Sequence, residues 1–290
     1  MILNGIEETR KILPSINLRD DSDRIDDFLM RAQQWVSDTI IGYGLEDLLD
    51  NENPEEPDGH GKLRLLVKRV IAVKAYIMFA DEMNLQLGEA GMTVQNNSDM
   101  NAASSARRDN LMKSLEDRMD HDCDALVNFL LRNSVSTDEG AQAAYGDWRD
   151  TEQFANLSVA FVPTLQELRR HLPFKAEYAG HWAAFSDSCM NMSVGMSDAA
   201  SPYVSMAEIV RLRDLYREGR LNEVQRQAVF RLQSVAAACL VDDQAQARKS
   251  AIGARSIMLD YLEEFPSFAE SDCLTLPGVS FNAGHIVDTL

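Results

Sequence analysis

The sequence of 290 residues has little of what marks a membrane, secreted or β-rich protein. It contains only 15 Gly and 8 Pro, and such low counts favour helices over a turn-rich β-sandwich. No apolar run approaches the roughly 18 residues that a bilayer span needs. The start of the chain has neither the basic segment nor the apolar core of a secretory signal. The four cysteines are widely separated, so we expect no zinc or redox motif and a reducing, cytoplasmic compartment.

Basic side chains are also scarce relative to acidic ones. The 28 Lys and Arg residues face 46 Asp and Glu residues, which gives a formal net charge of −18. A field of this sign repels phosphate groups, so we expect no membrane partner and no specific nucleic-acid binding. Hydrophobic residues make up 45% of the chain and charged residues 26%, as in proteins that bury a core, which argues against global disorder.

Apolar residues recur at helical spacing along most of the chain, and this pattern predicts an all-α protein with eight or nine helices in multi-helix bundles and no convincing strand. The longest predicted helices cover residues 22–40, 62–87, 104–132 and 243–265. Helix starts are predicted by capping residues at Thr164, Ser205 and Asn222. Gly219 is the expected end of the helix that Ser205 begins.

The predicted domains are an N-terminal helical bundle over residues 1–133, a C-terminal bundle over 134–266 and an extended tail over 267–290. Residues 133–140 are rich in Ser, Thr, Asp and Gly and mark the boundary between the bundles. A Pro-led tripeptide precedes the helices of each half, which raises the hypothesis that the halves are related. The polar segment 88–103 and the tail are the segments expected to engage a partner.

One helical stripe has residues that could bind a metal. Asp117, Asp120, His121 and Asp124 share a face, and carboxylates with an imidazole suit a divalent cation. A two-metal helical site needs Glu-x-x-His on two facing helices, and no second copy is present. The favoured interpretation is therefore an exposed acidic face. We expect no metal, no bound cofactor and no catalytic residue.

A basic stretch and the aromatic residues each have two interpretations. The densest basic stretch of the chain consists of Lys62, Arg64, Lys68, Arg69 and Lys74. It is either a solvated face that pairs with nearby acids or a contact for an acidic partner or a nucleic-acid backbone. The four aromatic residues at helical spacing are either core residues or a ligand cage; they are Trp35, Trp148, Tyr178 and Trp182.

The common catalytic signatures are missing. The chain has no Gly-rich or P-loop phosphate-binding motif, no Gly-x-Ser-x-Gly and no His-Glu-x-x-His. We therefore expect a protein that is not an enzyme.

Three local patterns follow one another in the first half of the chain. They are Leu13-Pro14-Ser15 before a helix with Ala32-Gln33-Gln34-Trp35-Val36, then Val67-Lys68-Arg69-Val70, then Leu85-Gln86-Leu87-Gly88-Glu89-Ala90-Gly91-Met92-Thr93-Val94. This succession resembles an uncharacterised all-helical family found in prophages of Bacteroides-like bacteria. The layout of residues 10–133 is similar to that of the small helical head–tail connector proteins of tailed phages.

The resemblance implies a virion assembly component, present in the bacterial cytoplasm during assembly and in the virion. Its partners would be copies of itself in a ring oligomer and phage portal or tail proteins. An acidic ring interior would not retain DNA that passes through it. Two alternatives remain, a helical regulatory or interaction protein of a bacterial host and a helical enzyme. A groove for a partner helix would favour the first, and a pocket with convergent polar groups the second.

Overall fold

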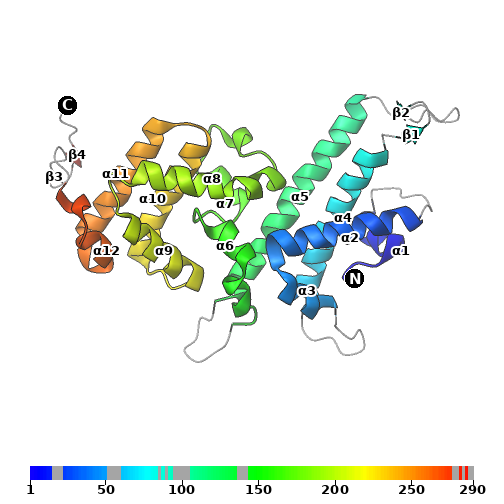
Figure 1. Ribbon diagram of the computed structural model, residues 1–290, viewed down its shortest axis with the longest axis horizontal. Helices are drawn as coiled ribbons and strands as arrows, with labels where there is room; N and C mark the ends of the chain where they lie inside the picture. The colour runs from blue at the N-terminus through cyan, green and yellow to red at the C-terminus, as the bar shows by residue number, and fades with distance from the viewer. Residues whose placement is uncertain are drawn as a thin grey trace. The chain divides into compact units, whose positions relative to one another are not determined.

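A computed structural model describes residues 1–14, 22–50, 60–83, 86–88, 91–93, 105–135, 143–275, 281–282 and 285–286 of the chain. The protein is all-α, and the described residues contain twelve α-helices (Figure 1). Eight or nine helices were predicted, so the predicted number is wrong. The additional helices are short: α1 (Gly5–Ile12), α3 (Tyr43–Asp50) and α12 (Pro266–Ala269). At most about two turns give too few residues for a visible periodicity.

Short strands form two antiparallel pairs. β1 (Gln86–Gly88) pairs with β2 (Gly91–Thr93), and β3 (Phe281–Asn282) pairs with β4 (His285–Ile286). Most of the predicted partner segment 88–103 lies outside the described residues. No helix in the described part of the chain is both long enough and apolar enough to cross a bilayer.

The contacts divide the chain into two compact units. Unit 1 is Met1–Phe154 with His181–Ala183, and unit 2 is Ala155–Gly180 with Ala184–Leu290. The division falls after Phe154 rather than at residue 133, because the 3-10 helix η2 (Gly146–Asp150) is held by unit 1. The indole Nε1 of Trp148 donates a hydrogen bond to the carbonyl of Ile40 at 2.7 Å.

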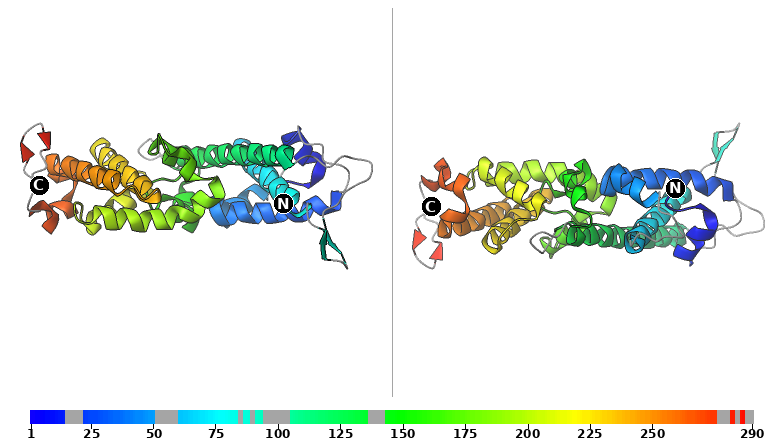
Figure 2. Two further views of the ribbon diagram at one scale, coloured as in Figure 1. Left: turned by 90° about the horizontal axis from the view of Figure 1, so that it is seen from above. Right: turned by 90° about the horizontal axis from the view of Figure 1, so that it is seen from below.

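The core of unit 1 is built around α4 (Gly61–Met83), which lies between α2 (Ser22–Val36) and α5 (Ser105–Asn133) (Figure 2). The apolar spacing of residues 62–87 places Leu63, Val67 and Val70 on one face, and all three are fully buried. Ala72 and Val73 are buried as well, because helices cover α4 on more than one side.

After α2 the helix widens into a π-helical turn, η1 (Ser37–Ile41). It ends at Gly42, whose φ of 75° lies in the region that favours glycine. The sequence offers both Gly42 and Gly44 as helix terminators. Gly42 ends the helix, whereas Gly44 lies inside α3.

Unit 2 contains the long helices α9 (Met206–Glu218), α10 (Glu223–Leu240) and α11 (Gln244–Asp260), and all of α8 (Trp182–Ala200) after its first two residues. Buried alanines on both α10 and α11 let these two helices pack along each other. The shorter elements are α6 (Glu152–Ser158), α7 (Leu165–Arg170) and the 3-10 helix η3 (Ala176–Ala179).

The predicted helix caps of unit 2 are confirmed. The side chains of Thr164 and Ser205 accept hydrogen bonds from the backbone N–H groups of Glu167 and Glu208, each at 3.2 Å. Asn222 forms a complete capping box with Gln225. Gly219 ends α9 in the left-handed conformation.

The chain after α11 folds back onto unit 2. It forms the 3-10 helix η4 (Leu262–Glu264), α12 and the 3-10 helix η5 (Asp272–Thr275). Phe265 and Phe268 are fully buried. The prediction of an extended tail from residue 267 is therefore wrong up to residue 275, because these phenyl rings fill the core of the unit. Most of the remaining tail lies outside the described residues.

Candidate functional site

The acidic stripe on α5 lies against the beginning of α8. The carboxylate of Asp120 accepts a 2.7 Å hydrogen bond from the backbone N–H of Trp182, the first residue of α8. Asp124 accepts a 2.9 Å hydrogen bond from the indole Nε1 of the same tryptophan. Asp120 is only 3% exposed and Asp124 8%. The predicted exposed acidic face is thus wrong for these two residues, because tertiary hydrogen bonds bury them.

His181 completes this cluster, and we name Glu116, Asp117, Asp120 and His181 the α5 acidic cluster. The imidazole Nδ1 lies 3.1 Å from Asp120 Oδ2, and its Nε2 lies 3.3 Å from Glu116 Oε2. Ligand atoms of Asp117, Asp120 and His181 lie within 4.8 Å of one another, a donor set that suits a divalent cation.

The predicted ligand set is therefore only partly brought together. Asp117 and Asp120 lie in the cluster, but His181 takes the place of the exposed His121. Asp124 is directed to the Trp182 indole instead. Sequence spacing gave no signal for His181, which lies 61 positions from Asp120.

The hydrogen bonds of Asp120 give it a structural role at the start of α8. A helix has unsatisfied N–H groups and a positive partial charge at its N-terminus, and a carboxylate there stabilises it.

Trp182 also contacts Trp35 edge to face, with ring centroids 6.2 Å apart. Trp148 and Trp182 are core residues, which supports the core interpretation of the aromatic residues. Tyr178 is the exception, since it is 64% exposed.

The basic stretch on α4 is paired within unit 1. Lys68 forms a 2.5 Å ion pair with Glu8, and Arg64 donates a 2.7 Å hydrogen bond to the carbonyl of Leu49. The ammonium groups of Lys62 and Lys74 lie over aromatic rings, at 5.3 and 4.7 Å from the centroids. These contacts favour the interpretation that the stretch pairs with its own surroundings.

Asp122 is a further buried carboxylate of α5, and it has fewer hydrogen-bond partners than Asp120 and Asp124. Its Oδ2 lies 3.6 Å from the Arg118 guanidinium and is a buried atom with no hydrogen-bond partner among the described residues. Burial raises the pKa of Asp122, even though the positive charges of Arg118 and Arg69 act to lower it.

The cysteines are free thiols. Burial raises the pKa of Cys123 well above its ordinary value and that of Cys189 to about 12. A thiolate is the reactive form, so both side chains behave as small apolar core residues.

One pocket of unit 1, with a volume of about 530 Å³, lies between α3 and the segment 143–151. Leu45 and Leu48 line one side, and Tyr145 and Trp148 line the other. Among the described residues that line the pocket, Asp147 is the only carboxylate.

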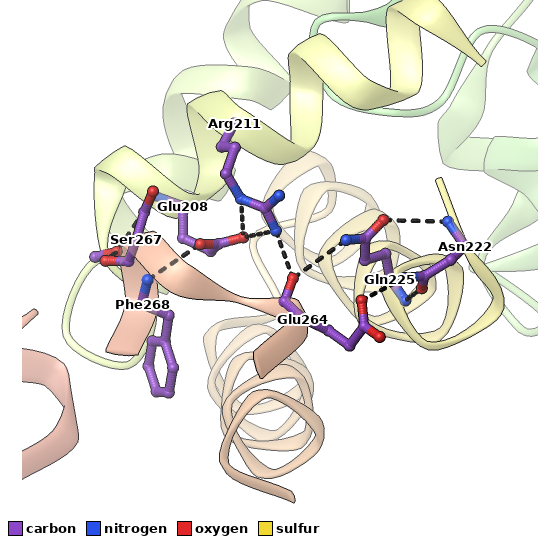
Figure 3. A network of polar contacts seen from close by, with 8 residues as sticks. Glu208, Arg211, Asn222, Gln225, Glu264, Ser267 and Phe268 are labelled. Carbon is purple, nitrogen blue, oxygen red and sulfur yellow. Dashed lines mark hydrogen bonds and ion pairs between the residues drawn. The ribbon is translucent and has the colours of Figure 1, made fainter. Parts of the chain in front are cut away.

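A second polar arrangement holds the end of unit 2 together, and we name it the C-terminal clasp (Figure 3). Fully buried Glu208 accepts a 3.0 Å hydrogen bond from the backbone N–H of Phe268. It also accepts two hydrogen bonds from the Arg211 guanidinium, at 2.9 and 2.8 Å. Arg211 in turn donates to the carbonyl of Glu264 at 2.6 Å.

The start of α10 contributes the other half of the clasp. Gln225 donates to the same Glu264 carbonyl at 3.1 Å, and Asn222 donates to the Glu264 carboxylate at 2.6 Å. Residues from the first turns of α9 and α10, where these helices are capped, thus also bind the chain after α11 (Figure 3). The capping roles were predictable from local sequence, whereas the second role was not.

Residues 22–156, from the start of α2 into α6, are similar to a family of unknown function (DUF6712). No curated protein and no solved structure gives a significant match. The match therefore lies almost wholly in unit 1 and brings no activity with it.

Proposed function

We propose that this chain is a non-enzymatic structural or assembly protein of a phage or prophage, similar to a head–tail connector or adaptor. It acts through self-association in a ring oligomer and through contacts with portal or tail proteins. It works in the bacterial cytoplasm during assembly and in the virion. The motifs of the first half, given above, are the basis of the resemblance to phage proteins.

Two observations support this proposal: buried carboxylates that hold helices in place, and large apolar side chains that are exposed. Asp120, Asp124 and Glu208 are buried carboxylates, and each accepts hydrogen bonds that fix one helix to another segment. These carboxylates therefore have structural hydrogen-bond partners within the chain. Large apolar side chains are instead exposed at several places, among them Met30, Phe174 and Met190. Aromatic residues and methionine are enriched at protein interfaces.

The charge of the chain is consistent with a connector. A ring with an acidic interior does not retain DNA, and the net charge of −18 is compatible with such an interior. The paired cations of α4 leave less positive charge available for the phosphate backbone.

The test is the native mass of the purified chain over a wide concentration range, together with electron microscopy of the largest species. A closed ring, and binding to a portal or tail protein of the same phage, is the expected result. A chain that stays monomeric and binds neither protein would overturn the proposal. A monomer or dimer that binds a single helix of a host protein would point to the regulatory or interaction alternative, and turnover of a small molecule would point to the enzyme.

A further inference from the structure

Helix α8 presents an exposed face that is acidic and partly apolar. Four exposed residues lie on the side of the helix opposite its buried residues, and we name them the α8 acidic face: Asp187, Met190, Val194 and Asp198. Met190 and Val194 are each 55% exposed. Among α8, α9, α10 and α11, α8 alone has acids and no Lys or Arg. Its two aspartates therefore have no cation beside them on their own helix.

Helices α10 and α11 present a face of the opposite charge. Within these two helices, acids occur only at the first residue of α10 and at the last residue of α11. Arg231 of α10 and Lys249 of α11 are exposed, and neither forms an ion pair with a residue that the structure describes. The Arg231 side chain lies against Gly253, one helical turn from Lys249. We name Arg231 and Lys249 the α10–α11 basic face.

The two faces lie on different sides of unit 2. Figure 2 shows α8, in yellow-green, along one side of the unit and α11, in orange, along the other. Helix α10 packs along α11, and it also packs against α8, where a Cβ on Gly195 would lie 3.0 Å from the Cβ of Cys239. The acidic face of one copy therefore does not meet the basic face of the same copy. A contact between the two faces requires two copies.

A second copy supplies the chemistry that each face lacks. The aspartates of the α8 acidic face complement Arg231 and Lys249 in charge, which favours one docking orientation. Met190 and Val194 would be removed from water against the aliphatic stems of these long basic side chains. A nucleic acid offers the basic face phosphate groups, but the net charge of −18 repels it. The observations thus favour the acidic face of another copy as the partner.

We infer that the α8 acidic face of one copy binds the α10–α11 basic face of the next copy. The inference deepens the proposed function and rests on the self-association that this function requires. The contact joins two different surfaces, so each copy keeps one free face of each kind for a further neighbour. Repetition of such a head-to-tail contact builds a ring when the rotation between copies closes.

The first test reverses the charge of each face. Asp187→Lys with Asp198→Lys makes the acidic face basic, and Arg231→Glu with Lys249→Glu makes the basic face acidic. Each double variant then places like charges across the contact, and sedimentation velocity should show a dissociation constant raised at least about tenfold. In an equimolar mixture, every contact between the two variants again joins opposite charges. The mixture should therefore assemble as the unaltered chain does.

The matched control reverses two exposed acids of α9, Asp214→Lys with Glu218→Lys, and so changes the net charge by the same amount as the α8 double variant. It should leave the dissociation constant near that of the unaltered chain. All the substituted side chains are exposed, so thermal melting should show that the three variants fold. Assembly of both face variants as tight as that of the control would overturn the inference, as would a mixture that assembles no more tightly than each variant alone.

The second test removes apolar surface without a change of charge. Val194→Ser should raise the dissociation constant about tenfold, because the valine is buried at the contact. Val210→Ser is the matched control, because Val210 is 46% exposed on α9 and lies outside both faces. Equal dissociation constants for these two variants would overturn the inference. Loss of duplex DNA binding in Arg231→Glu with Lys249→Glu, with assembly unchanged, would assign the basic face to phosphate groups and overturn it too.

These outcomes separate the inference from the proposed function. If the unaltered chain assembles and both face variants assemble equally well, these faces are not the contact and the assembly role stands. If the unaltered chain remains a monomer at every concentration and binds no portal or tail protein, both fail.

Discussion

The most direct test of the α5 acidic cluster is Asp120→Ala. The substitution leaves the backbone N–H of Trp182 without its 2.7 Å acceptor at the start of α8. Loss of a helix-capping acceptor costs about 1 kcal/mol, and loss of a hydrogen bond to a charged group costs about 1.5–3 kcal/mol. These two figures describe the same bond and are not added. Removing one negative charge from beside Glu116 and Asp117 offsets part of the loss. We expect a net decrease of about 2 kcal/mol in the free energy of unfolding.

The decrease can be measured by urea denaturation followed by tryptophan fluorescence, because Trp182 and Trp35 are in contact and report on this region. A unit of this size should also melt about 4–8 °C lower. Asp120→Asn keeps one oxygen as an acceptor and should lose less. Asp117→Ala is the matched control, an exposed aspartate on the same helix, with an expected change within about 0.5 kcal/mol. Equal stability of Asp120→Ala and Asp117→Ala would refute the structural role of Asp120.

Three further predictions concern other buried polar groups. Glu208→Ala removes the fully buried carboxylate that accepts hydrogen bonds from the Phe268 N–H and from Arg211. Denaturant unfolding should show a free energy of unfolding lower by about 3 kcal/mol. Glu218→Ala, at an exposed position of the same helix, is the control and should change it little. Asp122→Asn should stabilise the protein at pH 7, because burial raises the pKa of Asp122 in the folded state. With Asp122 present, the folded protein therefore loses stability as the pH rises from 3.8 through that pKa. A gain in stability from Asp122→Asn that is as large near pH 3.8 as at pH 7 would contradict this origin. Burial lowers the pKa of His171 below 6.5, so the unfolded chain binds the proton more readily than the folded chain. Stability should therefore fall as the pH drops below 6.5, and His171→Gln should show a smaller fall. Identical pH profiles of stability for His171→Gln and the unaltered chain would argue against this role of His171.

The helices that could be predicted are those whose cause is local. Thr164, Ser205 and Asn222 begin helices because their side chains accept hydrogen bonds from N–H groups three residues ahead. The apolar spacing of residues 62–87 likewise predicts the buried face of α4. A short helix such as α3 depends on tertiary contacts more than on its own periodicity. The sequence alone therefore does not predict α3 as a helix.

The candidate site was less predictable because its partners are distant in sequence. The stripe of acids on α5 was visible, but its burial depends on Trp182, about sixty positions away. An acid on a polar helical face normally predicts exposure, and only the folded chain shows which acids meet a donor. The tail was misjudged for the same reason. Phe265 and Phe268 are buried without a helical repeat. Their segment is held by Glu208 on α9, which accepts from the Phe268 N–H, and by Gln225 on α10, which donates to the Glu264 carbonyl.

The C-terminal clasp has a consequence for synthesis of the chain. Glu208 and Arg211 leave the ribosome before the backbone groups that they bind, which lie 60 and 53 positions later at Phe268 and Glu264. At roughly 5–20 residues per second, α9 and α10 exist for several seconds before those groups emerge. During that interval the acceptor that will be buried at Glu208 is still hydrated, and the helices of unit 2 can form but cannot close around it. A chain interrupted before residue 264 would stay in this open state, so the clasp makes completion of unit 2 depend on completion of the chain to that point, and interrupted chains would remain exposed to proteolysis.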